Sequence, residues 1–272
     1  MSRSLYISIA DWPVVLQLEG CDEKKWTRLT EYYAAFTVPI EPAAFGVRVQ
    51  VVPGEAFIAP ELGSTWQIRS TARNGRIEFE SHYEKGWADW TTGQAELVMR
   101  PNADPENFLR VLYAWHCLDE GSLLVHAAGV IRNGRGYVFF GASHSGKTTI
   151  SRFSLDHTVL SDDLVIVKKQ GDKYRVLGVP FRGEMVEGPR TNAAADLCGL
   201  FALKKDGEHH VAELTQSEQV ARLAACVPFV MSQPANIARV TDVCADLAAR
   251  VPIRELYFRR DSGFWSVIDG LE

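Results

Sequence analysis

The alternation of hydrophobic and polar residues in the first part of the chain predicts β-strands. Residues 5–18 and 45–52 are apolar at alternate positions or in runs of strand length. Asn74 and Gly75 separate two further alternating stretches, and this dipeptide is typical of a tight hairpin turn. We therefore expect residues 1–117 to form a small, mostly antiparallel β domain with one buried face. It contains no catalytic motif, which favours a role in docking or oligomerisation.

The pattern changes to a helical period after this region. Apolar residues recur at helical spacing in the stretch PENFLRVLYAWHCL, which begins with Pro105, a residue favoured at helix starts. We interpret residues 105–118 as a helix that connects two parts of the chain. The apolar positions that define its buried face are Phe108, Val111, Leu112, Trp115 and Leu118.

Strands and helices are mixed in the remainder of the chain. Short apolar runs at 123–131 and 136–140 are separated by a turn-rich RNGRG, and a second hairpin is expected around QGDK. Thr215 and Glu218 form a capping box that begins a helix. A longer helix, the strand IRELYF and a short terminal helix follow. We expect residues 118–272 to form an α/β or α+β domain, with a mixed sheet and flanking helices.

Composition and charge indicate which kinds of partner the chain can bind. The 272 residues are 46% hydrophobic and 23% charged with a net charge of −5, which is ordinary for a globular protein. A weakly acidic chain argues against nucleic-acid binding, which usually requires a strongly basic face. We interpret three short basic pairs as solvated surface: Lys168-Lys169, Lys204-Lys205 and Arg259-Arg260.

The sequence also bears on location. No apolar run approaches the roughly 20 residues of a membrane helix, and the first residues lack the apolar core of a signal peptide. Five widely spaced cysteines without a C-x-x-C pair are typical of reduced thiols. We expect a cytoplasmic protein with no membrane partner.

A phosphate-binding loop follows the second apolar run. Gly141, four residues, and then Gly146, Lys147 and Thr148 match G-x-x-x-x-G-K-[ST], between an expected strand and an expected helix. Consecutive backbone amides there form a positive concavity for phosphate, Lys147 reaches the β- and γ-phosphates, and the Thr148 hydroxyl binds Mg²⁺. The loop residues predicted to bind ATP are Gly141, Ala142, Ser143, His144, Ser145, Gly146, Lys147, Thr148 and Thr149.

Two adjacent acids stand further along the chain. Asp162 and Asp163 lie between apolar, β-branched runs, where a continuous strand would turn one carboxylate toward the core. We expect the strand to end there, so that both side chains serve the phosphate loop. One aspartate would serve Mg²⁺, and the other would accept a proton from an attacking hydroxyl. An ATPase acting on water needs only the first of these roles, so the doublet favours a kinase.

Three motifs together resemble the catalytic domain of HPr kinase/phosphorylase and its smaller relatives: LLVHAAGV, GASHSGKTT and LSDDLV. Their order and approximate spacing are similar to the family's, and VPIRELYFRRD is similar to the end of those relatives. The resemblance covers most of residues 120–272. It implies a P-loop kinase core related to the nucleotide domain of PEP carboxykinase, ATP-dependent phosphorylation of a serine or another hydroxyl, and homo-oligomeric assembly.

The resemblance also implies roles for individual residues. Asp163 corresponds to the catalytic proton acceptor, Asp162 to a metal ligand, and His126 to a residue beside the reacting phosphate; the reverse assignment of the two aspartates stays open. In LGVPFRGEM, Arg182 is a candidate for stabilising the γ-phosphate and Glu184 for contacting metal or substrate. An ordinary loop salt bridge is the alternative for both.

The sequence departs from the family pattern at two places. The family loop has glycine where His144 stands, and His144 would either strain the loop or contact phosphate through its imidazole. The family's longer motif associated with phosphorolysis is not recognisable. The reverse, phosphorolytic reaction is therefore less supported by the resemblance than the forward kinase reaction.

Two hypotheses about function follow. The first is an ATP- and Mg²⁺-dependent kinase that acts on a serine-like hydroxyl of a protein, a peptide or a small molecule. The second is a nucleotide-dependent binding module, or an ATPase without a phosphoryl acceptor. The absence of an N-K-x-D motif disfavours a GTPase, and the absence of an arginine-rich lid segment disfavours a nucleoside kinase.

Overall fold

The structure is a computed structural model. It describes residues 2–39, 45–60, 67–181, 183–185, 188 and 190–271. The chain divides into two compact units, Met1–Tyr113 and Ala114–Glu272. This division lies within helix α2 (Glu106–Asp119), close to the boundary expected after residue 117.

The first unit is built on a seven-stranded sheet with strand order β1-β2-β3-β7-β6-β5-β4. Its strands are β1 (Arg3–Ile9), β2 (Trp12–Glu19), β3 (Phe45–Val51), β4 (Ile68–Arg73), β5 (Arg76–Ser81), β6 (Glu84–Asp89) and β7 (Gln94–Met99). Helix α1 (Glu23–Tyr32) and a 3-10 turn, Ala34–Phe36, follow β2. In the predicted hairpin, Asn74 and Gly75 have φ values of 53° and 78°, as a tight turn between β4 and β5 requires.

The sheet of the first unit is antiparallel toward both edges and parallel in the middle. β3 pairs in parallel with both of its neighbours, β2 and β7, while the outer pairs are antiparallel. Parallel neighbours need a crossover, and α1 supplies it between β2 and β3. The hydrophobic pattern did not predict α1, because its buried residues are only Lys25 and Leu29. Its start is marked by Asp22, whose side chain accepts a hydrogen bond from the Lys25 amide at 2.7 Å.

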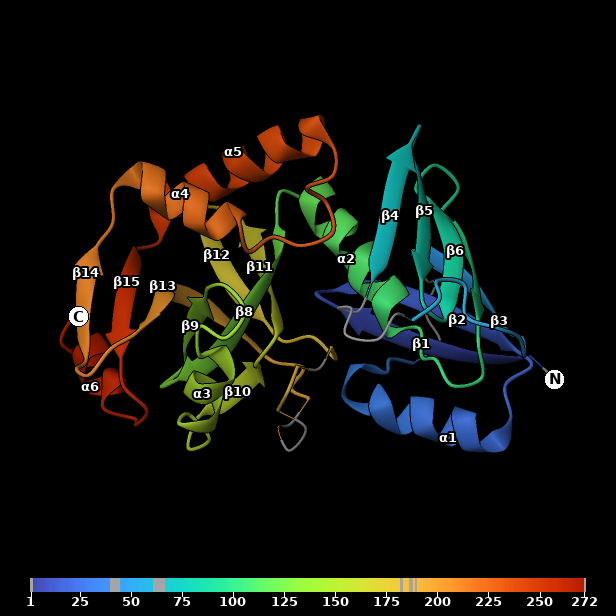
Figure 1. The fold of residues 1–272 in the computed structure, drawn as a ribbon, viewed down its shortest axis with the longest axis horizontal. Coiled ribbons are helices and arrows are strands. Elements are labelled where there is room, and N and C mark those ends of the chain that lie inside the picture. Colours follow the sequence, from blue (N-terminus) through green and yellow to red (C-terminus); the bar gives the residue numbers. More distant parts are fainter. Residues whose placement is uncertain are drawn as a thin grey trace. The chain divides into compact units, whose positions relative to one another are not determined.

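The second unit combines an eight-stranded sheet with helices. Its strands are β8 (Leu123–Arg132), β9 (Arg135–Phe140), β10 (Thr158–Ser161), β11 (Leu164–Gln170), β12 (Lys173–Leu177), β13 (Ala194–Lys205), β14 (His210–Glu213) and β15 (Ile253–Phe258). Its helices are α3 (Lys147–Arg152), α4 (Gln216–Ala224), α5 (Pro234–Arg250) and α6 (Phe264–Asp269), and α4 and α5 lie side by side (Figure 1). The capping box predicted at Thr215 and Glu218 begins α4.

This sheet is mixed, as expected. β13 runs parallel to both β9 and β15, and the remaining ladders are antiparallel. Because β9 pairs with both β13 and β8, the strands β8, β11, β12, β13 and β9 form a closed circuit. β13 is central to this circuit, and residues 194–205 carry no strand prediction in the sequence analysis.

The core of the second unit supports the parallel strands. Phe139 on β9 and Phe258 on β15 belong to one buried cluster, to which α6 adds Phe264, Trp265 and Ile268. In the part of the chain that is described, none of the helices is both long enough and apolar enough to cross a bilayer.

Candidate active site

The loop between β9 and α3 has the conformation that its glycines permit. Gly146 has φ +112°, and a Cβ at this position would lie 2.4 Å from the ring of Phe258. Both the backbone angle and the close ring exclude a side chain, so this position requires glycine. The strand, loop and helix expected from the sequence are therefore present in order, with α3 beginning at Lys147.

Lys147 is held against its own loop. Its side chain is buried, and Nζ donates to the carbonyl oxygens of Gly141 and Ala142 at 3.1 and 3.2 Å. Burial lowers the pKa of the Lys147 ammonium, while the thiol of Cys226 and nearby carboxylates, among them Asp163, act in the opposite direction. The ammonium is thus a partly desolvated positive charge, in which state it attracts phosphate more strongly than a fully solvated lysine would.

His144 occupies the left-handed region, with φ +63°, and its side chain is exposed. A non-glycine residue in this region is uncommon and costs about 1–2 kcal/mol. Glycine would adopt this conformation without that cost.

The aspartate doublet interrupts a strand. β10 ends at Ser161 and β11 begins at Leu164, and both pair with successive parts of β8. The Ser161 hydroxyl accepts hydrogen bonds from the amides of Asp163 and Leu164 at 3.2 Å each. This local turn breaks the alternation of side chains, so Asp162 and Asp163 both line one pocket with the phosphate loop.

Asp162 is joined to the loop through Thr148. Its Oδ2 accepts hydrogen bonds from the Thr148 hydroxyl at 3.1 Å and from the Met185 amide at 3.0 Å. The Asp162 residue is buried, so these bonds fix the carboxylate beside the first turn of α3. A hydroxyl and a carboxylate at this distance can share one cation.

Asp163 is paired with His126. The imidazole Nε2 lies 3.1 Å from Oδ1 of Asp163, and the side chains are 39% and 20% exposed, respectively. The backbones of the two strands hold this pair together, since Leu164 stands opposite His126 and the Ala127 amide donates to the Asp163 carbonyl at 2.9 Å. Because both side chains are partly exposed, the pair is accessible to a substrate from solvent. Because the strands hold the two backbones together, its geometry is fixed.

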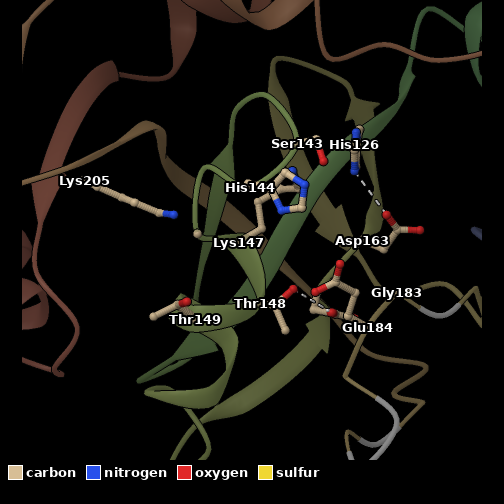
Figure 2. Close-up of a pocket in the computed structure, with 12 residues that line it drawn as sticks. His126, Ser143, His144, Lys147, Thr148, Thr149, Asp163, Gly183, Glu184 and Lys205 are labelled. Carbon is tan, nitrogen blue, oxygen red and sulfur yellow. Dashed lines mark hydrogen bonds and ion pairs between the residues drawn. The ribbon is translucent and has the colours of Figure 1, made fainter. Parts of the chain in front are cut away.

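The residues expected from the sequence mostly meet in one pocket of about 250 Å³, drawn in Figure 2. The expected residues that line it are His126, Ser143, His144, Gly146, Lys147, Thr148, Thr149, Asp162, Asp163 and Glu184. Gly141, Ala142 and Ser145 do not line it; the first two contribute the carbonyls that hold Lys147. Arg182 lies outside the described residues.

Two residues of the pocket were not expected from the sequence. Gly183 faces the aspartates, and Lys205 at the end of β13 points toward the phosphate loop (Figure 2). Gly183 had no signal beyond its place in LGVPFRGEM. Lys205 belongs to a basic pair that we interpreted as solvated surface, and it is exposed, but it also faces the pocket.

The pocket offers oxygen donors suited to Mg²⁺. Thr148, Asp162 and Glu184 bring a hydroxyl and two carboxylates to it, and hard oxygen donors are the ligands that Mg²⁺ prefers. Over the described residues, no group of three or more histidine, cysteine or acidic side chains is arranged to hold a metal by itself. Mg²⁺ in nucleotide sites is commonly held by one or two carboxylates together with phosphate oxygens, so this donor set fits it.

Comparison with known protein families shows to which family the chain belongs. Residues 106–271, more than half of the chain, match the model of the family described as SynChlorMet cassette protein ScmC. The chain belongs to this family. The matched region begins at the first residue of α2, and it contains the phosphate loop, His126 and both aspartates.

No curated protein sequence matches the chain. One solved structure that is similar is that of the Hpr(Ser) kinase/phosphatase from Coxiella burnetii. The similarity covers 54% of this chain and 95% of that one, at 7% sequence identity and a TM-score of 0.31.

Proposed function

We infer that the chain is an ATP-dependent kinase that transfers the γ-phosphate to a hydroxyl group. The inference is supported by a pocket in which a phosphate loop meets two carboxylates, one joined to the loop and the other joined to a histidine. Phosphoryl transfer depends mainly on positioning and on neutralising charge, and these residues supply both.

The loop side of the pocket would hold the nucleotide. Lys147 would exchange its bonds to the loop carbonyls for bonds to the β- and γ-phosphate oxygens. Thr148 and Asp162, with Glu184 nearby, would hold Mg²⁺. Mg²⁺ bound there would neutralise charge that develops on the phosphate oxygens.

The single observation that carries the proposal is the pair of His126 and Asp163. Asp163 would accept the proton of the attacking hydroxyl. At the same time, the hydroxyl oxygen of the substrate would bond to the γ-phosphorus, and the bond between the γ-phosphorus and the bridging oxygen of the β-phosphate would break. His126 would orient the Asp163 carboxylate toward the substrate. Hydrolysis with water needs no such second, oriented acid beside the metal ligand.

The acceptor would be a serine-like hydroxyl on a protein, a peptide or a small molecule. The first unit has the edge strands β1 and β4 in its sheet, and an extended peptide can bind such an edge by adding a strand. We propose docking of the acceptor, or homo-oligomer assembly, as the role of this unit.

The test is transfer from γ-labelled ATP to candidate acceptors by the full chain. Asp163→Asn should reduce labelling to a small residual rate and leave ATP binding largely unchanged, because Lys147, Thr148 and Asp162 would hold the nucleotide. Asp172→Asn is the matched control, since its side chain is 99% exposed and it lies outside the pocket. Release of inorganic phosphate alone, with every acceptor tried, would contradict the kinase assignment.

A nucleotide-dependent binding module, or an ATPase, is the second candidate. The observation that favours it is His144, which replaces a glycine at a left-handed position of the phosphate loop. If the loop has been altered to hold rather than to turn over nucleotide, bound ATP should persist with Mg²⁺ present. Single-turnover measurements of ATP loss with and without acceptors separate the cases: a binding module keeps ATP in both, an ATPase loses it in both, and the kinase loses it faster with an acceptor.

A further inference from the structure

A second pocket adjoins the phosphate-loop pocket. It has a volume of about 480 Å³ and is lined by Thr149, Lys205, Asp206, Phe258, Arg259 and Arg260. Thr149 and Lys205 also line the first pocket, so the two pockets are adjacent. A volume of this size is typical of a site for a small organic ligand.

The sheet brings the two pockets to the same edge. β9, β13 and β15 are parallel neighbours, with Phe140 opposite Ala202 and Lys205 opposite Phe258. The phosphate loop leaves the carboxyl end of β9, and the second pocket lies where β13 and β15 end. Carboxyl ends of parallel strands are the usual place for nucleotide sites in α/β proteins.

The two ends of the first pocket are lined by different residues. Thr149 and Lys205 lie at one end, and His126 and Asp163 lie at the other (Figure 2). If the γ-phosphate faces Asp163, the triphosphate chain runs along the loop and its α-phosphate end points toward Lys205. The second pocket begins at that end.

The side chains of the second pocket suit the remainder of a nucleotide. Lys205 and Arg260 are exposed cations with no ion-pair partner in the part of the chain that is described, whereas Arg259 pairs with Asp261 at 2.6 Å. An unpaired guanidinium can stack on an aromatic base, and an unpaired ammonium can bind phosphate. These contacts would satisfy charges that otherwise face only solvent.

Asp206 provides an acceptor in the same pocket. Its Oδ1 accepts hydrogen bonds from the amides of Gly207 and Glu208 at 2.6 and 3.3 Å, which fix the carboxylate at the end of β13. The Asp206 amide in turn donates to the carbonyl of Phe258 at 2.9 Å. Oδ2 has no partner within the described residues, so it is available to the hydroxyl groups of a sugar.

We propose that the second pocket binds the nucleoside half of the nucleotide. Lys205 contacts the α-phosphate, Asp206 accepts from a ribose hydroxyl, and Arg260 stacks on the base. This inference rests on the proposed nucleotide function of the first pocket, and it adds where the base lies and which residues contact it.

The experiment compares two ligands by calorimetry with Mg²⁺: ATP, and inorganic tripolyphosphate, which lacks the nucleoside. Arg260→Ala should weaken ATP binding about fivefold to tenfold and change tripolyphosphate binding by less than about twofold. Arg260 is exposed, so this variant should fold normally. Arg73→Ala, in an exposed residue of the first unit, is the matched control and should change neither affinity.

The outcomes separate this inference from the proposed function. If wild type binds ATP and Arg260→Ala binds both ligands as wild type does, the nucleoside assignment is wrong. The proposed binding of the triphosphate by the phosphate loop is then unaffected. An equal loss for both ligands also overturns it, because a general charge effect would then explain the result. If wild type binds neither ligand, the proposed nucleotide function fails and this inference fails with it.

Discussion

Gly183 lies so close to Asp162 that a Cβ on the glycine would stand 2.8 Å from both carboxylate oxygens, and 2.7 Å from the Cβ of Asp163. The main chain at residue 183 thus packs directly against the aspartate doublet. A glycine is needed here for close approach rather than for an unusual backbone angle.

This relationship predicts that Gly183→Ala damages the site. The added methyl group would push the carboxylates away from Thr148, and we expect a loss of stability of about 1–3 kcal/mol together with at least about a tenfold loss of phosphoryl transfer. Thermal unfolding and the labelled-ATP assay measure the two effects. Gly207→Ala is the control, because no atom lies within 4 Å of a Cβ there. Equal activities of both variants would show that residue 183 does not shape the site.

His144→Gly tests whether His144 strains the loop or contacts phosphate. Glycine adopts φ +63° without steric cost, so relief of strain alone should raise the free energy of unfolding by up to about 1 kcal/mol and leave ATP affinity unchanged. Contact of the imidazole with phosphate predicts instead a loss of ATP affinity of about fivefold or more. Chemical denaturation measures the change in stability, and calorimetry measures the change in ATP affinity. His144→Ala is the control, because it removes the imidazole but keeps the Cβ that causes the strain.

His126→Ala should slow phosphoryl transfer by about 10²-fold with little change in ATP affinity, because the His126 imidazole is paired with Asp163, the proposed proton acceptor. If the two residues act as a unit, His126→Ala should slow the Asp163→Asn protein by much less than it slows wild type. Single-turnover rates of the four proteins in this double-mutant cycle provide the measurement. Fully additive effects would contradict the pairing.

Glu84 in the first unit should make stability depend on pH. It is buried on β6 and accepts hydrogen bonds from Ser81, from the Asn107 side chain and from the Phe108 amide, yet burial raises its pKa to about 7. The folded state therefore binds more protons than the unfolded state between the ordinary value of 4.5 and about 7. Stability contributed by the protonated form is complete below this window and is lost as the pH rises through it, by about 3 kcal/mol.

The measurement compares urea unfolding of wild type and Glu84→Gln at about pH 5 and about pH 8. The variant should lack this loss on going to the higher pH. The comparison with the variant is necessary because His116 acts in the opposite direction: burial lowers its pKa to about 4, so its contribution to stability rises with pH. Parallel pH profiles for the two proteins would show that Glu84 does not titrate in this range.

The sequence by itself determined the local features. Asn74 and Gly75 specify their hairpin because their backbone angles depend on the residues themselves. The capping box begins α4, and the strand, loop and helix around Lys147 follow in order, because these features depend on neighbours only a few residues away. The break in the strand at the aspartate doublet was also expected, because adjacent carboxylates do not suit a continuous buried strand.

Only the tertiary structure decided which distant segments meet. β3 runs parallel to its neighbours, and β13 lies between β9 and β15, because ladder partners far apart in the chain leave no spacing signal in the sequence. For the same reason, Lys205 and Arg260 looked like ordinary solvated charges, although the ends of β13 and β15 bring them to one pocket beside the phosphate loop. Residue type and spacing fix short-range geometry, whereas the position of a side chain in a site depends on long-range strand pairing and burial.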